Sequence, residues 1–302
     1  MSAKPGYVIG VDGGGTGCRV RLSDASGRVL GEARSGPANL CSDFDRAMAN
    51  VLDGVARAYA AAGLDPAQRR NDTAWLGLAG AGVRELARRM EAALEDGLGF
   101  ARARVSTDSE TTAQGVLGDA DGVLALIGTG SFFLRRQAGH DRRIGGWGYQ
   151  LGDEAGGAWL GRAALRATLL AHDGLRQPSA LTRALMARHG GRPDEIARFA
   201  ASASPGDIAA LAPEIAAARD SGDPVARAIF DRAVRLICER LDFLGAEAAG
   251  KLCLAGGLAG TYAPLLPERL AALLHPPLGD ALDGATALAR ALQAQPRLRA
   301  GA

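Results

Sequence analysis

Two stretches of the sequence share one layout, in which an apolar strand, a glycine turn and a second strand follow one another. Residues 7–22 read YVIGVDGGGTGCRVRL, and residues 122–136 read GVLALIGTGSFFLRR. In the first stretch apolar and polar residues alternate after the turn, which predicts a strand with one buried face. Each turn joins strand to strand, whereas the P-loop and the dinucleotide fingerprint join a strand to a helix. Two copies in one chain predict two related domains that face each other.

The rest of the chain predicts an alternation of strands and helices. A capping pair, Ser42 and Asp45, precedes helical spacing of apolar residues from Phe44 to Tyr59. Apolar strands are predicted at 74–80, 103–108 and 251–257, an almost wholly helical region at 154–249, and a last helix at 284–294. Strands alternating with helices place the fold in the α/β class.

Composition and charge exclude several classes of protein. A length of 302 residues favours two domains, and Lys+Arg 35 against Asp+Glu 33 leaves a net charge of +2. With a net charge this small, the protein has no large electrostatic field that would attract nucleic acid or an acidic membrane. The dense basic cluster at 135–143 is expected to be a solvated hairpin tip. No apolar run reaches the ~18–20 residues of a membrane span. Asp12 interrupts the one apolar run near the N-terminus that could be part of a signal peptide. The four cysteines form no C-x-x-C pair. We therefore expect a cytoplasmic protein with free thiols.

Asp12 ends the first predicted strand, and Gly13, Gly14, Gly15 and Thr16 follow it. Bare glycine amides form a nest for phosphate oxygens, and a carboxylate beside them can orient Mg²⁺ through water. An alternative interpretation is a tight turn whose glycines adopt positive φ, with Asp12 as its cap. The residues alone leave both interpretations open.

Asp108 ends another predicted strand, and it also has two interpretations. A carboxylate there can accept the proton of a substrate hydroxyl as a general base. Aspartate in this position more commonly caps the helix that follows.

Three glycine-rich stretches from residue 128 onward offer further candidates. GTGS at 128–131 suits a γ-phosphate or a hairpin turn. In GGWGYQLGDEAGG, residues 145–157, Asp153 and Glu154 can accept hydrogen bonds from sugar hydroxyls or begin the next helix. LAGGLAG at 254–260 lets a flat ring lie against bare backbone, or it serves close packing of a helix on a strand.

The order of these motifs resembles the actin-like ATPase superfamily, and in particular the BadF/BadG/BcrA/BcrD-type ATPases and the branch that holds N-acetylglucosamine kinase and bacterial glucosamine kinase. VIGVDGGGTGCRVRL is similar to the first phosphate motif, STDSETT to the stretch with the catalytic aspartate, and LALIGTGSFF to the second phosphate motif. GGWGYQLGDEAGGAWLG resembles a stretch typical of amino-sugar kinases, and LAGGLAG resembles the adenosine motif.

The resemblance implies a duplicated, ribonuclease H-like fold of two actin-like domains with the active site in the cleft between them. One domain would comprise residues 1–111 and 285–302, and the other residues 112–284. The activity implied is transfer of the ATP γ-phosphate to the 6-hydroxyl of glucosamine or N-acetylglucosamine. A homodimer without nucleic-acid or membrane partners is also expected.

For the nucleotide, the resemblance assigns roles to each matching position. Asp12 would help to bind Mg²⁺, with water between them. The residues expected to contact ATP are Gly13, Gly14, Gly15, Thr16, Thr129, Gly130, Gly256 and Gly257.

For the sugar, the resemblance assigns the asparagine that follows Gly-Pro, here Asn39, and the aspartate of GDE, here Asp153. Thr129 and Gly130 would touch the sugar as well as phosphate, and Asp108 would deprotonate its 6-hydroxyl.

The chain departs from the animal N-acetylglucosamine kinases near the sugar. It has Leu40 and Cys41 in place of His-Trp, Phe132 in place of a small polar residue, and 155–156 reads Ala-Gly in place of Gly-Ser. These departures favour a bacterial glucosamine-type kinase.

Three alternatives stay open. An iron–sulfur ATPase activator of a radical dehydratase or reductase is one, although the chain has no cysteine between Cys41 and Cys238. A catalytically inactive sugar sensor is another. The third is a kinase for another sugar, such as anhydro-N-acetylmuramic acid or a hexose.

Overall fold

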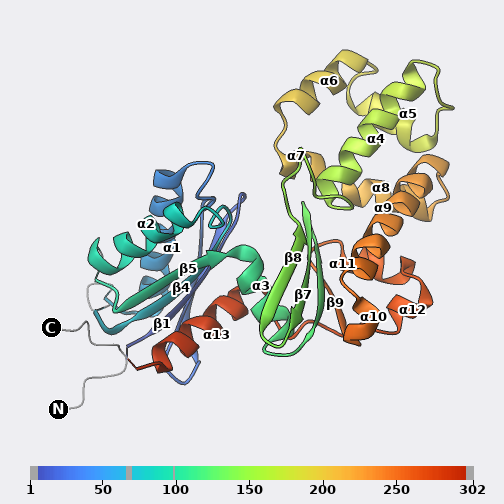
Figure 1. The fold of residues 1–302 in the computed structure, drawn as a ribbon. Helices are drawn as coiled ribbons and strands as arrows, with labels where there is room; N and C mark the ends of the chain where they lie inside the picture. The colour runs from blue at the N-terminus through green and yellow to red at the C-terminus, as the bar shows by residue number, and fades with distance from the viewer. Residues whose placement is uncertain (1–5, 66–69, 98, 297–302) are drawn as a thin grey trace, which may run out of the picture. The chain divides into compact units, whose positions relative to one another are not determined.

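The structure, a computed structural model, describes residues 6–65, 70–97 and 99–296, and the chain divides into two units. Unit 1 comprises Met1–Asp119 and Pro277–Ala302, and unit 2 comprises Ala120–Pro276. Each unit has its own sheet and its own hydrophobic core (Figure 1).

Unit 1 contains five strands and, among its described residues, four α-helices and a π-helical turn. They are β1 (Val8–Gly13), β2 (Cys18–Ser23), β3 (Val29–Ser35), α1 (Phe44–Ala61), β4 (Thr73–Leu78), α2 (Arg84–Ala92), η2 (Ala93–Gly97), β5 (Arg102–Thr107), α3 (Asp108–Leu117) and α13 (Ala281–Ala294).

The sheet of unit 1 has the order β3-β2-β1-β4-β5. The first three strands form an antiparallel meander, and β4 and β5 run parallel to β1. On one face, apolar side chains of β1, β2 and β4 meet the apolar side of α1, which buries Val51, Val55 and Tyr59. The alternation after the first glycine turn is confirmed, because Cys18, Val20 and Leu22 are buried.

Helix α13 is far from α3 in the sequence but lies against it and against β1 (Figure 1). The two helices cross at glycines: a Cβ on Gly115 would collide with the carbonyl of Asp280, and a Cβ on Gly284 would collide with that of Thr111. The boundaries expected at 111 and 285 lie inside these helices. The division into units keeps both helices whole in unit 1, since they pack on each other.

Unit 2 contains four strands and, among its described residues, nine α-helices and a 3-10 turn. They are β6 (Gly122–Ile127), β7 (Ser131–Gln137), β8 (His140–Gly145), α4 (Gly157–His172), α5 (Ala180–Arg188), α6 (Pro193–Ser202), α7 (Pro205–Ala209), α8 (Ala212–Asp220), α9 (Pro224–Phe243), α10 (Ala246–Ala249), β9 (Leu252–Ala255), α11 (Ala259–Tyr262), η3 (Ala263–Leu265) and α12 (Glu268–Ala271).

The sheet of unit 2 repeats the first four strands of the unit 1 sheet, without a counterpart of β5 among the described residues. Its order is β8-β7-β6-β9, with β6, β7 and β8 antiparallel and β9 parallel to β6. The strand–glycine turn–strand unit is therefore duplicated as expected, together with the meander and the parallel strand beside it. Pro193, Pro205 and Pro224 each stand at the first position of a helix, where the missing N–H costs nothing.

Two local predictions were wrong. Helix α1 is capped by Asp43, whose side chain accepts a hydrogen bond from Arg46 N, and not by Ser42. The 135–143 cluster does form a hairpin, with Ala138 and Gly139 at its turn, but it is not wholly solvated. Arg136 is buried beside Asp141, with N–O distances of 2.8 Å, because a two-pronged ion pair offsets part of the cost of burying the charge.

Among the described residues, no helix combines the length and apolar character needed to cross a membrane.

We predict that Gly284→Ala destabilises unit 1. Alanine favours a helix, but here its Cβ meets the backbone of α3, so the two helices must separate, at a cost of about 1–3 kcal/mol. Chemical denaturation would measure the free energy of unfolding. Gly260→Ala in α11 is the matched control, because that glycine is exposed and has no atom within 4 Å of the added Cβ. Equal stability of the two variants would contradict the close helix crossing.

Candidate active-site edges of the two sheets

The candidate residues of unit 1 gather at one edge of its sheet. In the parallel register Gly13 lies opposite Leu78, and Leu78 lies opposite Thr107. The carboxyl ends of β1, β4 and β5 are thus side by side, and each strand lies about 4.8 Å from the next. The glycine loop after β1 and Asp108 after β5 therefore occupy the same edge, with the end of β4 between them.

The first glycine loop is held by backbone hydrogen bonds and has an open face. Gly14 N donates to Gly17 O, and Ala38 N donates to Gly14 O, both at 2.9 Å. A Cβ on Gly13 would press on Leu78 and Ala38, at 2.6 and 2.8 Å, whereas nothing lies within 4 Å of one on Gly14 or Gly15. None of these three glycines has a positive φ, so the interpretation that they serve a positive-φ turn is wrong. The space beside Gly14 and Gly15 is available to a ligand.

Arg19 holds the side chain of Asp12 in place. Its Nε and Nη2 both donate to Asp12 Oδ2, at 3.0 and 2.7 Å, and its Nη1 donates to Asp280 Oδ2 at 2.6 Å. The sequence analysis missed this residue. The signal was available, because closing the hairpin over residues 14–17 puts Arg19 directly opposite Asp12.

The residues around Asp12 fit a magnesium ion that is bound mainly by other ligands. Both hydrogen bonds from Arg19 reach Oδ2, and Oδ1 has no partner among the described residues. No group of three or more acidic, histidine or cysteine side chains that could enclose a metal occurs in the described part of the chain. Mg²⁺ commonly uses one or two carboxylates and takes its other ligands from water and substrate phosphates.

Asn39 lies at the same edge, where it forms a bridge with Ala79 just beyond β4. Its Oδ1 accepts hydrogen bonds from Cys41 N and Ser42 N, at 3.0 and 3.3 Å. Within the described chain its Nδ2 has no partner, so the amide can donate to a ligand. The orientation of the Asn39 carboxamide is fixed, because the backbone amides of Cys41 and Ser42 both donate to its Oδ1.

Asp108 is the first residue of α3 and does not cap it. The cap is Thr107, whose side chain accepts from Glu110 N, so the capping interpretation of Asp108 is wrong. Asp108 Oδ1 accepts from Ser109 N at 2.9 Å, and the carboxylate is partly exposed. Negative charge on the first turn of a helix interacts favourably with the helix dipole.

The second glycine loop, at 128–131, rests on the start of α4. Gly157 N donates to Gly128 O at 2.8 Å, and Ala158 N donates to Thr129 O at 3.0 Å. A Cβ on Gly156 would lie 2.8 Å from the carbonyl carbon of Gly130, so this position requires glycine. The first amides of α4, which a helix leaves unpaired, are thereby satisfied by the loop.

Asp153 lies against that loop in a left-handed backbone conformation, with φ 58°. Its carboxylate accepts backbone hydrogen bonds from Gly148 and Ser131, and it leaves no room for a Cβ on Gly130. Partial burial raises the pKa of the Asp153 carboxyl above its ordinary value, and these hydrogen bonds offset only part of that shift.

Glu154 is used differently, since its carboxylate pairs with Arg240 at 3.0 Å. Its backbone carbonyl accepts from Ser131 Oγ at 2.6 Å. The helix-start interpretation of both acids is wrong, because α4 begins at Gly157 with Gly156 as its cap. Neither Arg240, from α9, nor its role was predictable from the sequence pattern.

The 256–258 segment meets the second glycine loop at the end of β6. Gly256 has φ 90°, and a Cβ there would lie 2.5 Å from Ile127 O, so this position packs closely against the end of β6. Leu258 N donates to that same oxygen at 2.9 Å. Gly257 has an open face, with nothing within 4 Å of a Cβ. The structure thus brings residues 128–131, 153 and 256–257 together in unit 2.

We predict that Asp153 makes stability fall as pH rises. The pKa of its carboxyl is higher in the folded than in the unfolded chain, where it is about 3.9. Its contribution to stability is fully present below the unfolded value and is lost as pH rises through the folded value. In urea denaturation between pH 3.5 and 8, the stability of the wild type relative to Asp153→Asn should decline over that window. A difference that is constant with pH, or that grows, would contradict the assignment.

Comparison with known proteins gives this arrangement its relatives. The chain is 29% identical to the glucosamine kinase GspK of Vibrio cholerae, over 92% of this chain and 94% of that one. It is 30% identical to an N-acetylmuramic acid/N-acetylglucosamine kinase of Clostridium acetobutylicum, over 55% of each chain. Among solved structures, a candidate N-acetylglucosamine kinase from Chromobacterium violaceum has a TM-score of 0.86 and 35% identity, and the match covers 95% of this chain and 99% of that one.

These likenesses and the duplicated sheets confirm the predicted actin-like ATPase fold. The sequence profile of the BadF/BadG/BcrA/BcrD ATPase family matches residues 9–268, which is most of the chain. The chain therefore belongs to the BadF/BadG/BcrA/BcrD ATPase family.

Proposed function

We propose that this chain is an ATP-dependent amino-sugar kinase that transfers the γ-phosphate of ATP to the 6-hydroxyl of glucosamine. The observation that carries the proposal is the edge of the unit 1 sheet. There the Asp12 carboxylate and the open glycine loop stand at the end of β1, and Asp108 follows the end of β5, with β4 paired between these two strands. A phosphate-binding loop, a metal-orienting acid and a base are the parts that phosphoryl transfer to an alcohol needs.

The nucleotide contacts use open backbone. We assign the ATP phosphates to Gly14, Gly15 and Thr16 in unit 1, because a Cβ on Gly14 or Gly15 would have no atom within 4 Å. Thr129 and Gly130 supply the second phosphate contact, and the bare face of Gly257 suits the adenine ring. Gly13 and Gly256 support these contacts through packing, because a Cβ at either position would collide with neighbouring protein atoms.

Asp12 would orient Mg²⁺ through its Oδ1, with water between them, while Arg19 holds Oδ2. The metal supplies neutralisation of the phosphate charge when it is bound. Because two Arg19 nitrogens bind Oδ2, Arg19 also limits how far the Asp12 carboxylate can rotate.

Asp108 would accept the proton of the sugar 6-hydroxyl as that oxygen attacks the γ-phosphorus. Thr107 caps α3, and Asp108 lies on the first turn of that helix, directly after β5. Attack forms the new oxygen–phosphorus bond and breaks the bond to ADP, and the hydroxyl proton passes to the carboxylate.

Asn39 would donate a hydrogen bond to the sugar, and Asp153 would accept one from it. Asn39 Nδ2 is a donor without a protein partner among the described residues, and the Asp153 carboxylate is an acceptor. The left-handed backbone of Asp153 costs about 1–2 kcal/mol, a cost that is typical of residues kept for a ligand.

Glucosamine is the first choice of substrate because a glucosamine kinase matches nearly the whole chain. The departures near the sugar agree with this choice. Phe132 is buried, so the position has no polar group to offer an acetamido group, and Gly156 cannot become serine without moving the second glycine loop. N-acetylglucosamine remains the second substrate to test.

A coupled assay of ADP release with Mg-ATP tests the function, using glucosamine, N-acetylglucosamine, N-acetylmuramic acid and glucose. We expect turnover with glucosamine to exceed that with the other sugars. In Asp108→Asn, turnover should fall by a factor on the order of 10² or more with ATP binding retained. Asp119→Asn, at the exposed end beyond the same helix, is the control. ADP release that no sugar stimulates, or an active Asp108→Asn enzyme, would refute the proposal.

For Asp12→Ala we predict a higher Mg²⁺ requirement, seen as a rightward shift of at least several-fold in the Mg²⁺ titration of activity. The control is Asp280→Ala, since Asp280 shares Arg19 with Asp12 but is the N-cap of α13. That variant should keep the wild-type Mg²⁺ midpoint. An unchanged midpoint in Asp12→Ala would remove this residue from the metal site.

A further inference from the structure

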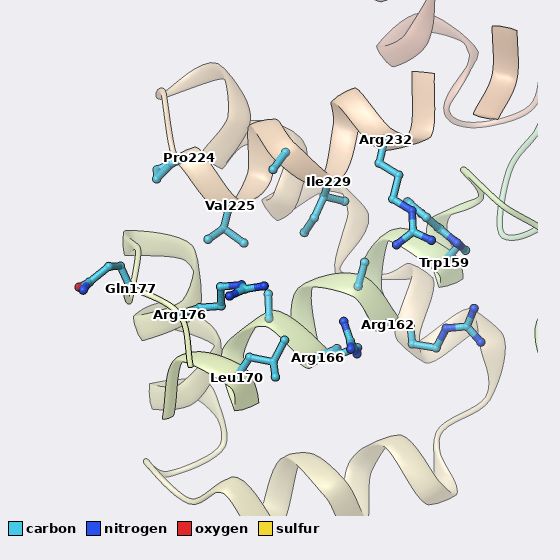
Figure 2. A pocket seen from close by; sticks show the side chains of 13 residues that line it. Trp159, Arg162, Arg166, Leu170, Arg176, Gln177, Pro224, Val225, Ile229 and Arg232 are labelled. Atoms are coloured by element: carbon cyan, nitrogen blue, oxygen red, sulfur yellow. The ribbon is translucent and has the colours of Figure 1, made fainter. Parts of the chain in front are cut away.

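A cavity of about 760 Å³ lies between α4 and α9 of unit 2, apart from the glycine loops (Figure 2). Its inner wall is apolar, formed by Trp159, Leu170, Val225 and Ile229. Trp159 and Ile229 are only 7% and 8% exposed, so they form a fixed floor. The volume falls within the range of about 300–1,000 Å³ that small-molecule sites occupy.

Four arginines line the same cavity: Arg162, Arg166, Arg176 and Arg232. None of the described residues that line it is acidic, and within the described chain none of the four has an ion pair. Figure 2 shows Arg176 and Arg232 directed into the space between the helices. Elsewhere in unit 2 arginines such as Arg188 and Arg240 are paired with glutamates. The cavity therefore concentrates uncompensated positive charge in a protein whose net charge is only +2.

Two of the four arginines, Arg162 and Arg232, are held in position by contacts within the protein. Arg162 Nη1 donates to Tyr149 O at 3.2 Å, and its guanidinium lies over the Tyr149 ring at 5.1 Å. Arg232 lies 5.5 Å from the centre of the Trp159 ring. These contacts leave further N–H donors on each guanidinium, because each has five and no acceptor.

We propose that this cavity binds a small phosphate ester with an apolar or planar body, as a site separate from the kinase centre. Guanidinium groups recognise phosphate through paired hydrogen bonds, and the number of unpaired arginines suits a dianion. The floor of Trp159 and Ile229 suits the body of the ligand and disfavours an ion that is hydrated on all sides.

Helix α4 connects this site to the second glycine loop. Its first amides, of Gly157 and Ala158, bind the carbonyls of Gly128 and Thr129, and its later turns line the cavity. A ligand held between α4 and α9 would thus act on the helix that supports that loop. This regulatory consequence rests on the proposed function, whereas the binding site does not.

Calorimetric titration of the full chain with phenyl phosphate tests the site, and inorganic phosphate serves as a probe with charge alone. The titration is done with and without a non-hydrolysable ATP analogue, which distinguishes the cavity from the glycine loops. We expect one phenyl phosphate per chain in both conditions, bound more tightly than inorganic phosphate. The double variant Arg166→Gln/Arg176→Gln should raise Kd by about tenfold or more. Arg183→Gln, an exposed arginine of α5 outside the cavity, is the control.

Quenching of Trp159 fluorescence by phenyl phosphate, lost in Trp159→Phe while the calorimetric signal persists, would locate the ligand. No binding, binding abolished by the ATP analogue, or an unchanged Kd in the double variant would overturn the proposal. The proposal would also be overturned if the chain bound no phenyl phosphate and the double variant differed from the wild type in sedimentation coefficient. That result would mean that a second copy covers the cavity. Binding by a chain that phosphorylates no sugar would keep this site and refute only the kinase.

Discussion

The parallel pairing of β1 with β4 and of β6 with β9 is the constraint on which each candidate site depends. Parallel strands end at the same edge of a sheet, so the residues after each strand become neighbours without any nearness in sequence. In unit 1 this brings together the loop after Gly13, the turn after Leu78 and the start of α3. In unit 2 it brings the loop after Ile127 to Gly256. A shift of one residue in either register would point the side chains of a strand to the opposite face.

Glycine serves two purposes at these edges, and the structure separates them. Gly13, Gly156 and Gly256 are required by the protein, since a Cβ would collide with neighbouring atoms. Gly14, Gly15 and Gly257 are not required for packing, because a Cβ there would meet open space. At the ends of these strands, backbone that no neighbouring atom covers is open to a ligand, and this openness supports the assignment of phosphate and adenine contacts.

The acids at the two edges are held in different ways. Arg19 fixes Asp12 and Arg240 fixes Glu154, so each of these carboxylates has its charge balanced in place. Partial burial disfavours the anion of Asp153, and its backbone donors offset only part of that effect. Its backbone is also left-handed. Function and stability therefore make opposite demands on Asp153, as they commonly do where a protein must meet a polar ligand.

The sequence by itself determined the duplicated strand–glycine turn–strand units, the α/β class, the family and the candidate acids. Those features follow from local pattern: period-two alternation, proline and glycine positions, and motif order. Only the tertiary structure decided which interpretation of each candidate holds. Thr107 rather than Asp108 caps α3, Gly156 rather than an acid begins α4, and Arg240 reaches Glu154 from another helix. Capping and ion pairing depend on side-chain direction and on contacts between distant segments, which a linear pattern does not contain.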